Sequence, residues 1–202
     1  MKNFKNFICI ILIVISFTSE LFALNSYTII DSNNISLLAK QIALQEVGIK
    51  EIGNNRGARI DLYNKTAGVA LGSPYCASGI YYCFYTASTT LNKKNIIKRT
   101  ASANGQYDYL AKKGIKDKKY NVKNTSLIIW KYPNSYYGHI EKTYKVLSNG
   151  NIQTIGFNTT PGNVGNQRNG GGVYIRMRNV KHKLGRMSVR GIINFETKTN
   201  IE

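Results

Sequence analysis

Cysteine and histidine are the residues of this sequence best suited to nucleophilic chemistry. The stretch GSPYCASGIYYCFY, residues 72–85, carries Cys76 and Cys83 seven residues apart. Ser73 can cap a helix and Pro74 suits the first helical position, which places Cys76 in the first turn. Unpaired N–H groups and the helix dipole favour a thiolate there. The sequence therefore predicts Cys76 as a nucleophile.

The second cysteine lies about two helical turns further on, which is roughly 10.5 Å of helix rise. A disulfide needs Cα atoms less than about 7 Å apart, so one helix cannot bridge the pair. A structural zinc site shared by both cysteines and the two histidines is the less favoured alternative, since zinc cysteines usually stand about two to four residues apart. Cys83 stands in the apolar run IYYCFY and is expected to be a buried packing residue. We expect no metal and no cofactor.

A nucleophilic cysteine needs a base, and the two histidines of the chain are His139 and His182. His139 begins the strand-like pattern GHIEKTYKV, whereas His182 lies in the basic, loop-like NVKHKLGR, where a solvated side chain is expected. His139 is therefore the predicted base. The Asn-Gly pair at 149–150 predicts a hairpin in which residues whose numbers sum to about 299 lie opposite each other. This register brings Asn158 close enough to orient the His139 imidazole.

Helical patterns come first in the chain and strand patterns second. Apolar spacing predicts helices over 36–49, around 60–63, and over 102–114. Strand patterns cover 126–132, 137–147, 151–157, 171–180 and 190–195. The Gly- and Asn-rich stretch 159–172 is expected to be an exposed loop. This order predicts an α+β fold with N-terminal helices packed on a C-terminal antiparallel sheet.

The first residues have the layout of a secretory signal peptide. Lys2 and Lys5 precede an apolar run from Phe7 to Phe17, which is short for a membrane span. We expect cleavage after Ala23, with an uncleaved anchor as the alternative. The expected boundaries are thus 1–23 for the signal peptide and 24–202 for a single domain with its core at about 37–196. The predicted location is secreted or periplasmic, with no membrane span after cleavage.

The formal net charge of +18 predicts affinity for polyanions. For an exported protein these are cell-wall polymers and membrane headgroups. Nucleic acid is the competing partner, and export argues against it. Alternatively, the positive charge reflects biased use of Lys and Asn in the sequence and has no role in binding.

Several segments resemble, in order and spacing, the CHAP branch of the NlpC-like, papain-related cell-wall peptidases and amidases. They are EVGIKEIGNNRGARIDLYN, GSPYCASGIYYCF, TASANGQYDYLAKKG, YGHIEKTYKV and TIGFNTT, and they span about residues 45–180. The resemblance implies a papain-like, NlpC-like fold and hydrolysis of amide bonds in peptidoglycan, within its peptides or between glycan and L-alanine. It implies Cys76 as nucleophile, His139 as base and Asn158 as the residue that orients His139. We also predict substrate contacts for Tyr75, Arg56 and Tyr137. For the Tyr-rich stretches 81–85 and 132–137, half-buried core and strand positions are the alternative.

Many relatives carry an acidic residue two positions before the asparagine, and here that position is Gly156. We therefore expect a Cys-His-Asn set. The departure also raises an alternative function, a catalytically weak or inactive module of the same fold that binds the cell wall.

Overall fold

Four helices precede the sheet in the part of the chain that the computed structural model describes, which is residues 35–113, 116, 120–161 and 170–195. They are α2 (Ile35–Gln45), α3 (Ala58–Ala67), α4 (Cys76–Thr90) and α5 (Ala103–Lys112). The expected signal peptide, residues 1–23, lies outside the described residues. No helix in the described ranges is long and apolar enough to cross a membrane.

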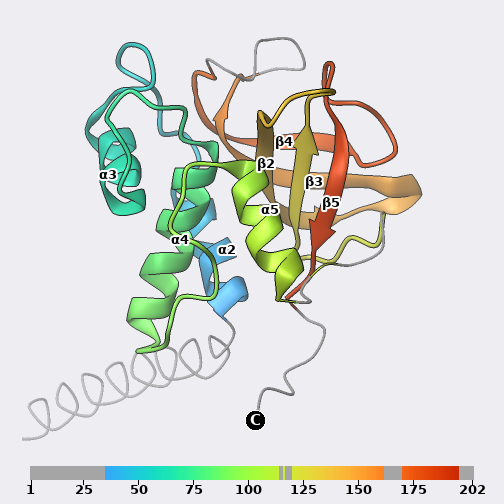
Figure 1. The fold of residues 1–202 in the computed structure, drawn as a ribbon, viewed down its shortest axis with the longest axis horizontal. Coiled ribbons are helices and arrows are strands. Elements are labelled where there is room, and N and C mark those ends of the chain that lie inside the picture. Colours follow the sequence, from blue (N-terminus) through green and yellow to red (C-terminus); the bar gives the residue numbers. More distant parts are fainter. Residues whose placement is uncertain (1–34, 114–115, 117–119, 162–169, 196–202) are drawn as a thin grey trace, which may run out of the picture. The chain divides into compact units, whose positions relative to one another are not determined.

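Five strands follow and form one antiparallel sheet. They are β1 (Leu127–Lys131), β2 (Gly138–Val146), β3 (Asn151–Thr159), β4 (Gly172–Asn179) and β5 (Ser188–Ile193). Their order across the sheet is β4-β3-β2-β1-β5. Figure 1 shows α2, α3 and α4 grouped beside the sheet, with α5 next to its strands. The predicted α+β fold and all five strands are confirmed.

Side chains alternate between the two faces of the sheet along each strand, and each face carries a cluster of buried residues. Leu127, Ile129, Ile155 and Phe157 belong to the core that includes the helices. Ile128, Trp130, Ile152, Val189 and Ile192 form a second cluster with Val180 and Met187, and no helical residue belongs to it. Helix α4 packs on β2 and β3, so the centre of the sheet and the start of α4 are held together by the first core.

Two expected boundaries are wrong. The helix expected over 36–49 ends at Gln45, because Gly48 has φ 98° and lies outside the right-handed helical region. The hairpin turn is present as a short 3₁₀ helix over Ser148–Gly150. The register behind it differs by two residues from the expected one, since Glu141 lies opposite Gly156 and not Asn158. An irregularity between Thr143 and Lys145 accompanies this shift.

Candidate functional site

Cys76 is the first residue of α4, and its side chain lies at the edge of the core with 6% of the residue exposed. The expected cap is wrong. Tyr75, not Ser73, occupies the N-cap position, and no side chain caps the helix there. The first-turn N–H groups of a helix have no partner within the helix. Cys76 therefore sits at the positive end of α4 without a side-chain cap competing for those donors.

His139 is the second residue of β2, and only 1% of it is exposed. It lies opposite Trp130 of β1, with 6.3 Å between the ring centroids. Because α4 packs on β2, the start of this helix brings Cys76 to His139, and the two side chains interact. The predicted nucleophile and base are thus neighbours in the structure.

Glu141, two residues after His139, is the partner of the imidazole. His139 Nε2 lies 3.0 Å from Glu141 Oε1, and Glu141 is fully buried. Residues i and i+2 of a strand point to the same face, so β2 alone is sufficient to place the two side chains together. Sequence reasoning missed Glu141, although the spacing His-x-Glu at a strand start was the available signal.

The Glu141 carboxylate is held by further groups. Arg178 donates to it from Nε at 3.0 Å and from Nη2 at 2.6 Å, which is the paired geometry of a guanidinium and a carboxylate. Thr154 donates its hydroxyl to Oε2 at 2.5 Å. Arg178 is itself 9% exposed. The result is a buried row of interacting groups from Cys76 through His139 and Glu141 to Arg178.

Burial and charge act against each other on these groups. Burial lowers the pKa of His139, but contacts with Cys76 and Glu141 outweigh it and raise that pKa to about 9. Burial raises the pKa of Glu141, but the charges of Arg178 and His139 outweigh it and hold that pKa well below its usual range. At neutral pH the pair is therefore an imidazolium beside a carboxylate.

Gly156 lies directly opposite Glu141 in the sheet. A Cβ atom at this position would lie 2.8 Å from Glu141 Oε1 and 3.0 Å from Thr159 Cγ2. The Glu141 carboxylate thus occupies the space into which a side chain at position 156 would project. The chain therefore has an acid beside His139 after all, placed on β2 itself and opposite Gly156 of β3.

Asn158 lies near Cys76 and His139, but its contacts differ from the expected ones. It lines the same cavity as Cys76 and His139. Its Oδ1 accepts a hydrogen bond from the Gly170 backbone N–H at 2.9 Å, and its Nδ2 has no hydrogen-bond partner among the described residues. The contact that orients His139 comes from Glu141 and not from Asn158.

A cavity of about 690 Å³ opens beside Cys76 and His139. The loop between β1 and β2 and the turn before β5 form much of its wall. Its lining comprises Pro74, Cys76, Tyr132, Pro133, Ser135, Tyr137, Gly138, His139, Asn158, Arg186 and Met187. Such a cavity, mostly apolar with a few polar groups, is typical of a ligand site.

Of the three residues expected to contact substrate, Tyr137 lines the cavity, whereas Tyr75 and Arg56 are not among the lining residues described. Tyr137 lines the cavity and is 73% exposed. Tyr75 is fully buried and donates its hydroxyl to Glu51 at 3.0 Å, so it has a structural place behind the site. Arg56 pairs with Asp61 on the surface and is not among the residues that line the cavity.

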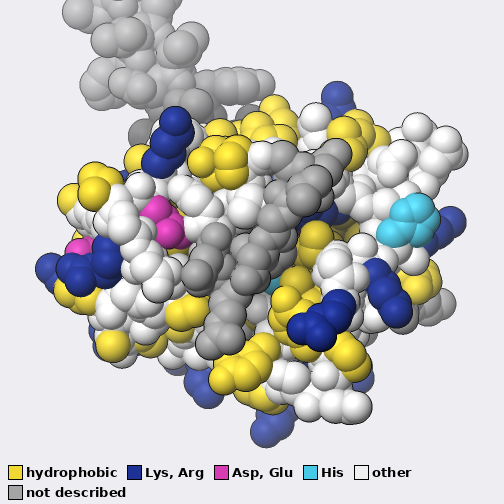
Figure 2. All heavy atoms as spheres, turned by 90° about the horizontal axis from the view of Figure 1, so that it is seen from above, with side chains coloured by type: hydrophobic (Ala, Val, Ile, Leu, Met, Phe, Trp, Pro, Cys, Tyr) yellow, Lys and Arg dark blue, Asp and Glu magenta, His cyan; other side chains and the backbone are white. Residues whose placement is uncertain are grey.

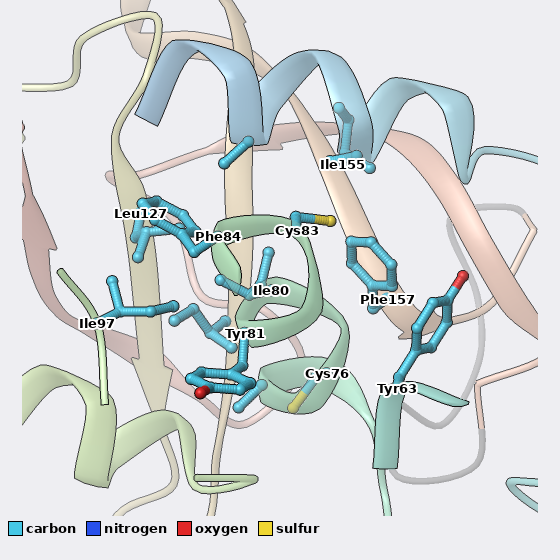
Figure 3. Close-up of a cluster of buried hydrophobic side chains, with 14 of the residues drawn as sticks. Tyr63, Cys76, Ile80, Tyr81, Cys83, Phe84, Ile97, Leu127, Ile155 and Phe157 are labelled. Atoms are coloured by element: carbon cyan, nitrogen blue, oxygen red, sulfur yellow. The ribbon is translucent and has the colours of Figure 1, made fainter. Parts of the chain in front are cut away.

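Cys83 has the expected place in the core. Both cysteines of α4 are free, which confirms that they form no disulfide. Figure 3 shows Cys83 near Phe84 and Phe157, about two helical turns from Cys76. Burial raises the pKa of the Cys83 thiol well above its usual value. His182 is exposed, as expected. In the described ranges no cluster of three or more candidate ligands could hold a metal ion.

No protein-family model, no curated protein and no solved structure matches this chain. The residues and their geometry therefore carry the functional argument.

Proposed function

We propose that the protein is a cysteine-dependent hydrolase of amide bonds. The observation that carries this proposal is the placement of Cys76 at the start of α4 beside a buried His139–Glu141 pair, all at one cavity. A nucleophile, a base and a group that orients the base are the parts that thiol catalysis requires. An ion pair with a purely structural role also perturbs pKa values, so the perturbed pKa values alone do not indicate catalysis. A structural ion pair does not require a cysteine thiol beside it at a cavity.

The chemistry follows from these parts. The Cys76 sulfur attacks the carbonyl carbon, and the carbonyl oxygen becomes an oxyanion. His139 gives its proton to the leaving nitrogen, the C–N bond breaks, and the amine departs. A water molecule then gives a proton to His139 while its oxygen attacks the thioester carbon. The acid product leaves, and Cys76 and His139 return to their starting state.

In this mechanism Glu141 and Arg178 are positioning residues. Glu141 fixes the orientation of the imidazole and stabilises its protonated form. Arg178 keeps the Glu141 carboxylate ionised in spite of its burial. Buried charges need partners of this kind, because an isolated one is costly.

The substrate that we propose is peptidoglycan. The protein acts on it either as an endopeptidase that cleaves its peptides or as an N-acetylmuramoyl-L-alanine amidase. The support is the CHAP-like resemblance of the segments around Cys76 and His139, and the α+β arrangement is compatible with a papain-like fold. The proposed location is outside the cell or in the periplasm, at the wall. Lys and Arg side chains are spread around the face in Figure 2, which suits contact with anionic wall polymers.

The charge of the cavity further limits the range of substrates that fit it. Arg186 lines it, and its guanidinium lies 5.8 Å from the centre of the Tyr132 ring. Among the lining residues that the structure describes, none is Asp or Glu. The acidic residues of the described ranges are Glu46, Glu51, Asp61, Asp108 and Glu141, and each has a hydrogen-bonded partner other than Arg186. A substrate with a carboxylate near the scissile amide fits this cavity best.

Peptidoglycan sacculi test the proposal. Wild-type protein and a Cys83→Ala control are expected to release new amino groups from sacculi, and Cys76→Ala is expected to release none. If wild type releases no more than Cys76→Ala, the hydrolase proposal is wrong. Co-sedimentation of the unreactive protein with sacculi would then support the alternative, a module that only binds the wall.

A further inference from the structure

Asn158 is the last but one residue of β3, and its backbone is in the left-handed region with φ 54°. Asparagine is one of the few residues other than glycine that adopts this conformation readily. The residue is 1% exposed. A buried residue in a sparsely populated conformation must be held there by its surroundings.

Two contacts hold Asn158. Gly170 donates its backbone N–H to Oδ1 at 2.9 Å. Gly170 also approaches so closely that a Cβ atom on it would lie 2.1 Å from the carbonyl carbon of Asn158. On the other side, the backbone N–H of Asn158 interacts with the Tyr75 hydroxyl. Since Tyr75 directly precedes Cys76, this contact ties Asn158 to the start of α4.

These contacts leave one strong donor unused. Because Oδ1 accepts from Gly170, the orientation of the amide is fixed, and Nδ2 is the remaining end. Nδ2 is buried and has no hydrogen-bond partner among the described residues. An unpaired buried donor is costly, so its persistence needs an explanation.

We propose that Asn158 is a catalytic residue whose Nδ2 donates a hydrogen bond to the oxyanion formed when Cys76 attacks the substrate. This inference rests on the hydrolase function proposed above. Asn158, Cys76 and His139 line one cavity, so a bound carbonyl group can meet the thiol and the amide together. The Cys76 backbone N–H at the start of α4 is the second donor. Donors fixed before the reaction stabilise developing charge without reorganisation.

The proposal differs in a testable way from the role expected on sequence grounds, in which Asn158 orients His139. An oxyanion donor acts on the transition state, so its removal lowers kcat and leaves KM and the titration of His139 unchanged. Loss of an orienting residue would change the titration of His139. The two roles therefore separate in one set of variants.

Asn158→Gly removes the side chain at a position whose φ glycine adopts without strain. Asn158→Asp keeps the shape and the acceptor for Gly170 but removes the donor. Asn92→Gly is the matched control, since Asn92 also has positive φ and lies beyond the end of α4. Both Asn158 variants are expected to lose about 10²- to 10³-fold in kcat on a soluble muropeptide with KM changed less than about twofold. Asn92→Gly should keep wild-type kinetics.

A second measurement does not depend on turnover. A peptide aldehyde forms a tetrahedral adduct with Cys76, and the affinity of the protein for this aldehyde should fall about 100-fold in Asn158→Gly. The Cys76→Ala variant binds the peptide without cleaving it. Adding Asn158→Gly to Cys76→Ala should leave the affinity for the uncleaved peptide unchanged. The His139 NMR titration should remain near pH 9 in Asn158→Gly. Wild-type kcat in Asn158→Gly, or a shifted His139 titration, would overturn the inference and leave the hydrolase proposal standing. Absence of hydrolysis by the wild type would instead remove both.

Discussion

Replacement of Glu141 by glutamine tests the electrostatics of the site most sharply. The change keeps the shape of the side chain and removes the charge beside His139. In the wild type, burial alone would lower the pKa of His139, yet that pKa is about 9 against an ordinary 6.5. Without the Glu141 carboxylate the charge on this side that raises the His139 pKa is lost, the Cys76 contacts remain, and the Arg178 cation is no longer balanced by a carboxylate. An opposite charge at this distance is worth about one to three pH units, so we expect a midpoint below about pH 8.

NMR can measure this directly, because the chain has only two histidines. The exposed His182 serves as the internal reference, and a His182→Gln variant assigns the two imidazole signals. Asp61→Asn is the matched control, since it removes one carboxylate from the exposed Arg56–Asp61 pair. Glu141→Gln should also lower kcat/KM by about 10²- to 10⁴-fold, because the imidazole loses its orienting partner. A His139 midpoint that stays near pH 9 in Glu141→Gln would show that Glu141 does not raise the pKa of His139.

Three further predictions concern the same site. Gly156→Ala should push against the Glu141 carboxylate, because its Cβ would lie 2.8 Å from Oε1. We expect the free energy of unfolding in urea to fall by about 1–3 kcal/mol and the hydrolytic activity to fall as well. Unchanged kinetics would contradict this. The raised pKa of His139 stabilises the fold fully below about pH 6.5 and progressively less as pH rises through about 9, while the lowered pKa of Glu141 contributes above about pH 4.5 and is lost in acid. Wild type should therefore exceed His139→Gln in free energy of unfolding by up to about 3 kcal/mol between about pH 5 and 6.5, and by much less at pH 10. Arg186→Gln should raise KM about tenfold for peptides with a free carboxylate near the scissile bond and leave the carboxamide analogues unchanged, with Lys183→Gln as a control for net charge; equal effects on both peptides would count against a carboxylate contact.

The elements of the fold could be predicted because they depend on local patterns. Alternating and continuous runs of apolar residues were sufficient for all five strands. The cap of α5 also lies in the expected range, since Ser102 accepts a hydrogen bond from the Gly105 N–H. The start of α4 could be placed within two residues. The error there arose because Ser73 and Pro74 fit a cap pattern, while Tyr75 occupies the N-cap and its buried hydroxyl donates to Glu51. That contact joins residues 24 apart and leaves no local signal.

The third residue of the site was missed for a related reason. The predicted hairpin register favours Asn158. The turn over Ser148–Gly150 shifts that register by one residue, since Val146 lies opposite Ile152, and the irregularity between Thr143 and Lys145 shifts it by one more. Glu141 needed no register at all, since it shares a strand face with His139. Its role became visible only with Arg178, Thr154 and Gly156 around it, because a buried carboxylate is tolerable only where such partners surround it.

The most direct test of the central claim is mass spectrometry of the fragments released from defined peptidoglycans. We expect fragments with a new amino group and a new carboxyl group at one amide bond, formed by wild type and Cys83→Ala and not by Cys76→Ala. The bond would then be identified by the new terminus. Fragments cut at glycosidic bonds, or the same amide products from Cys76→Ala, would contradict hydrolysis by the Cys76 thiol.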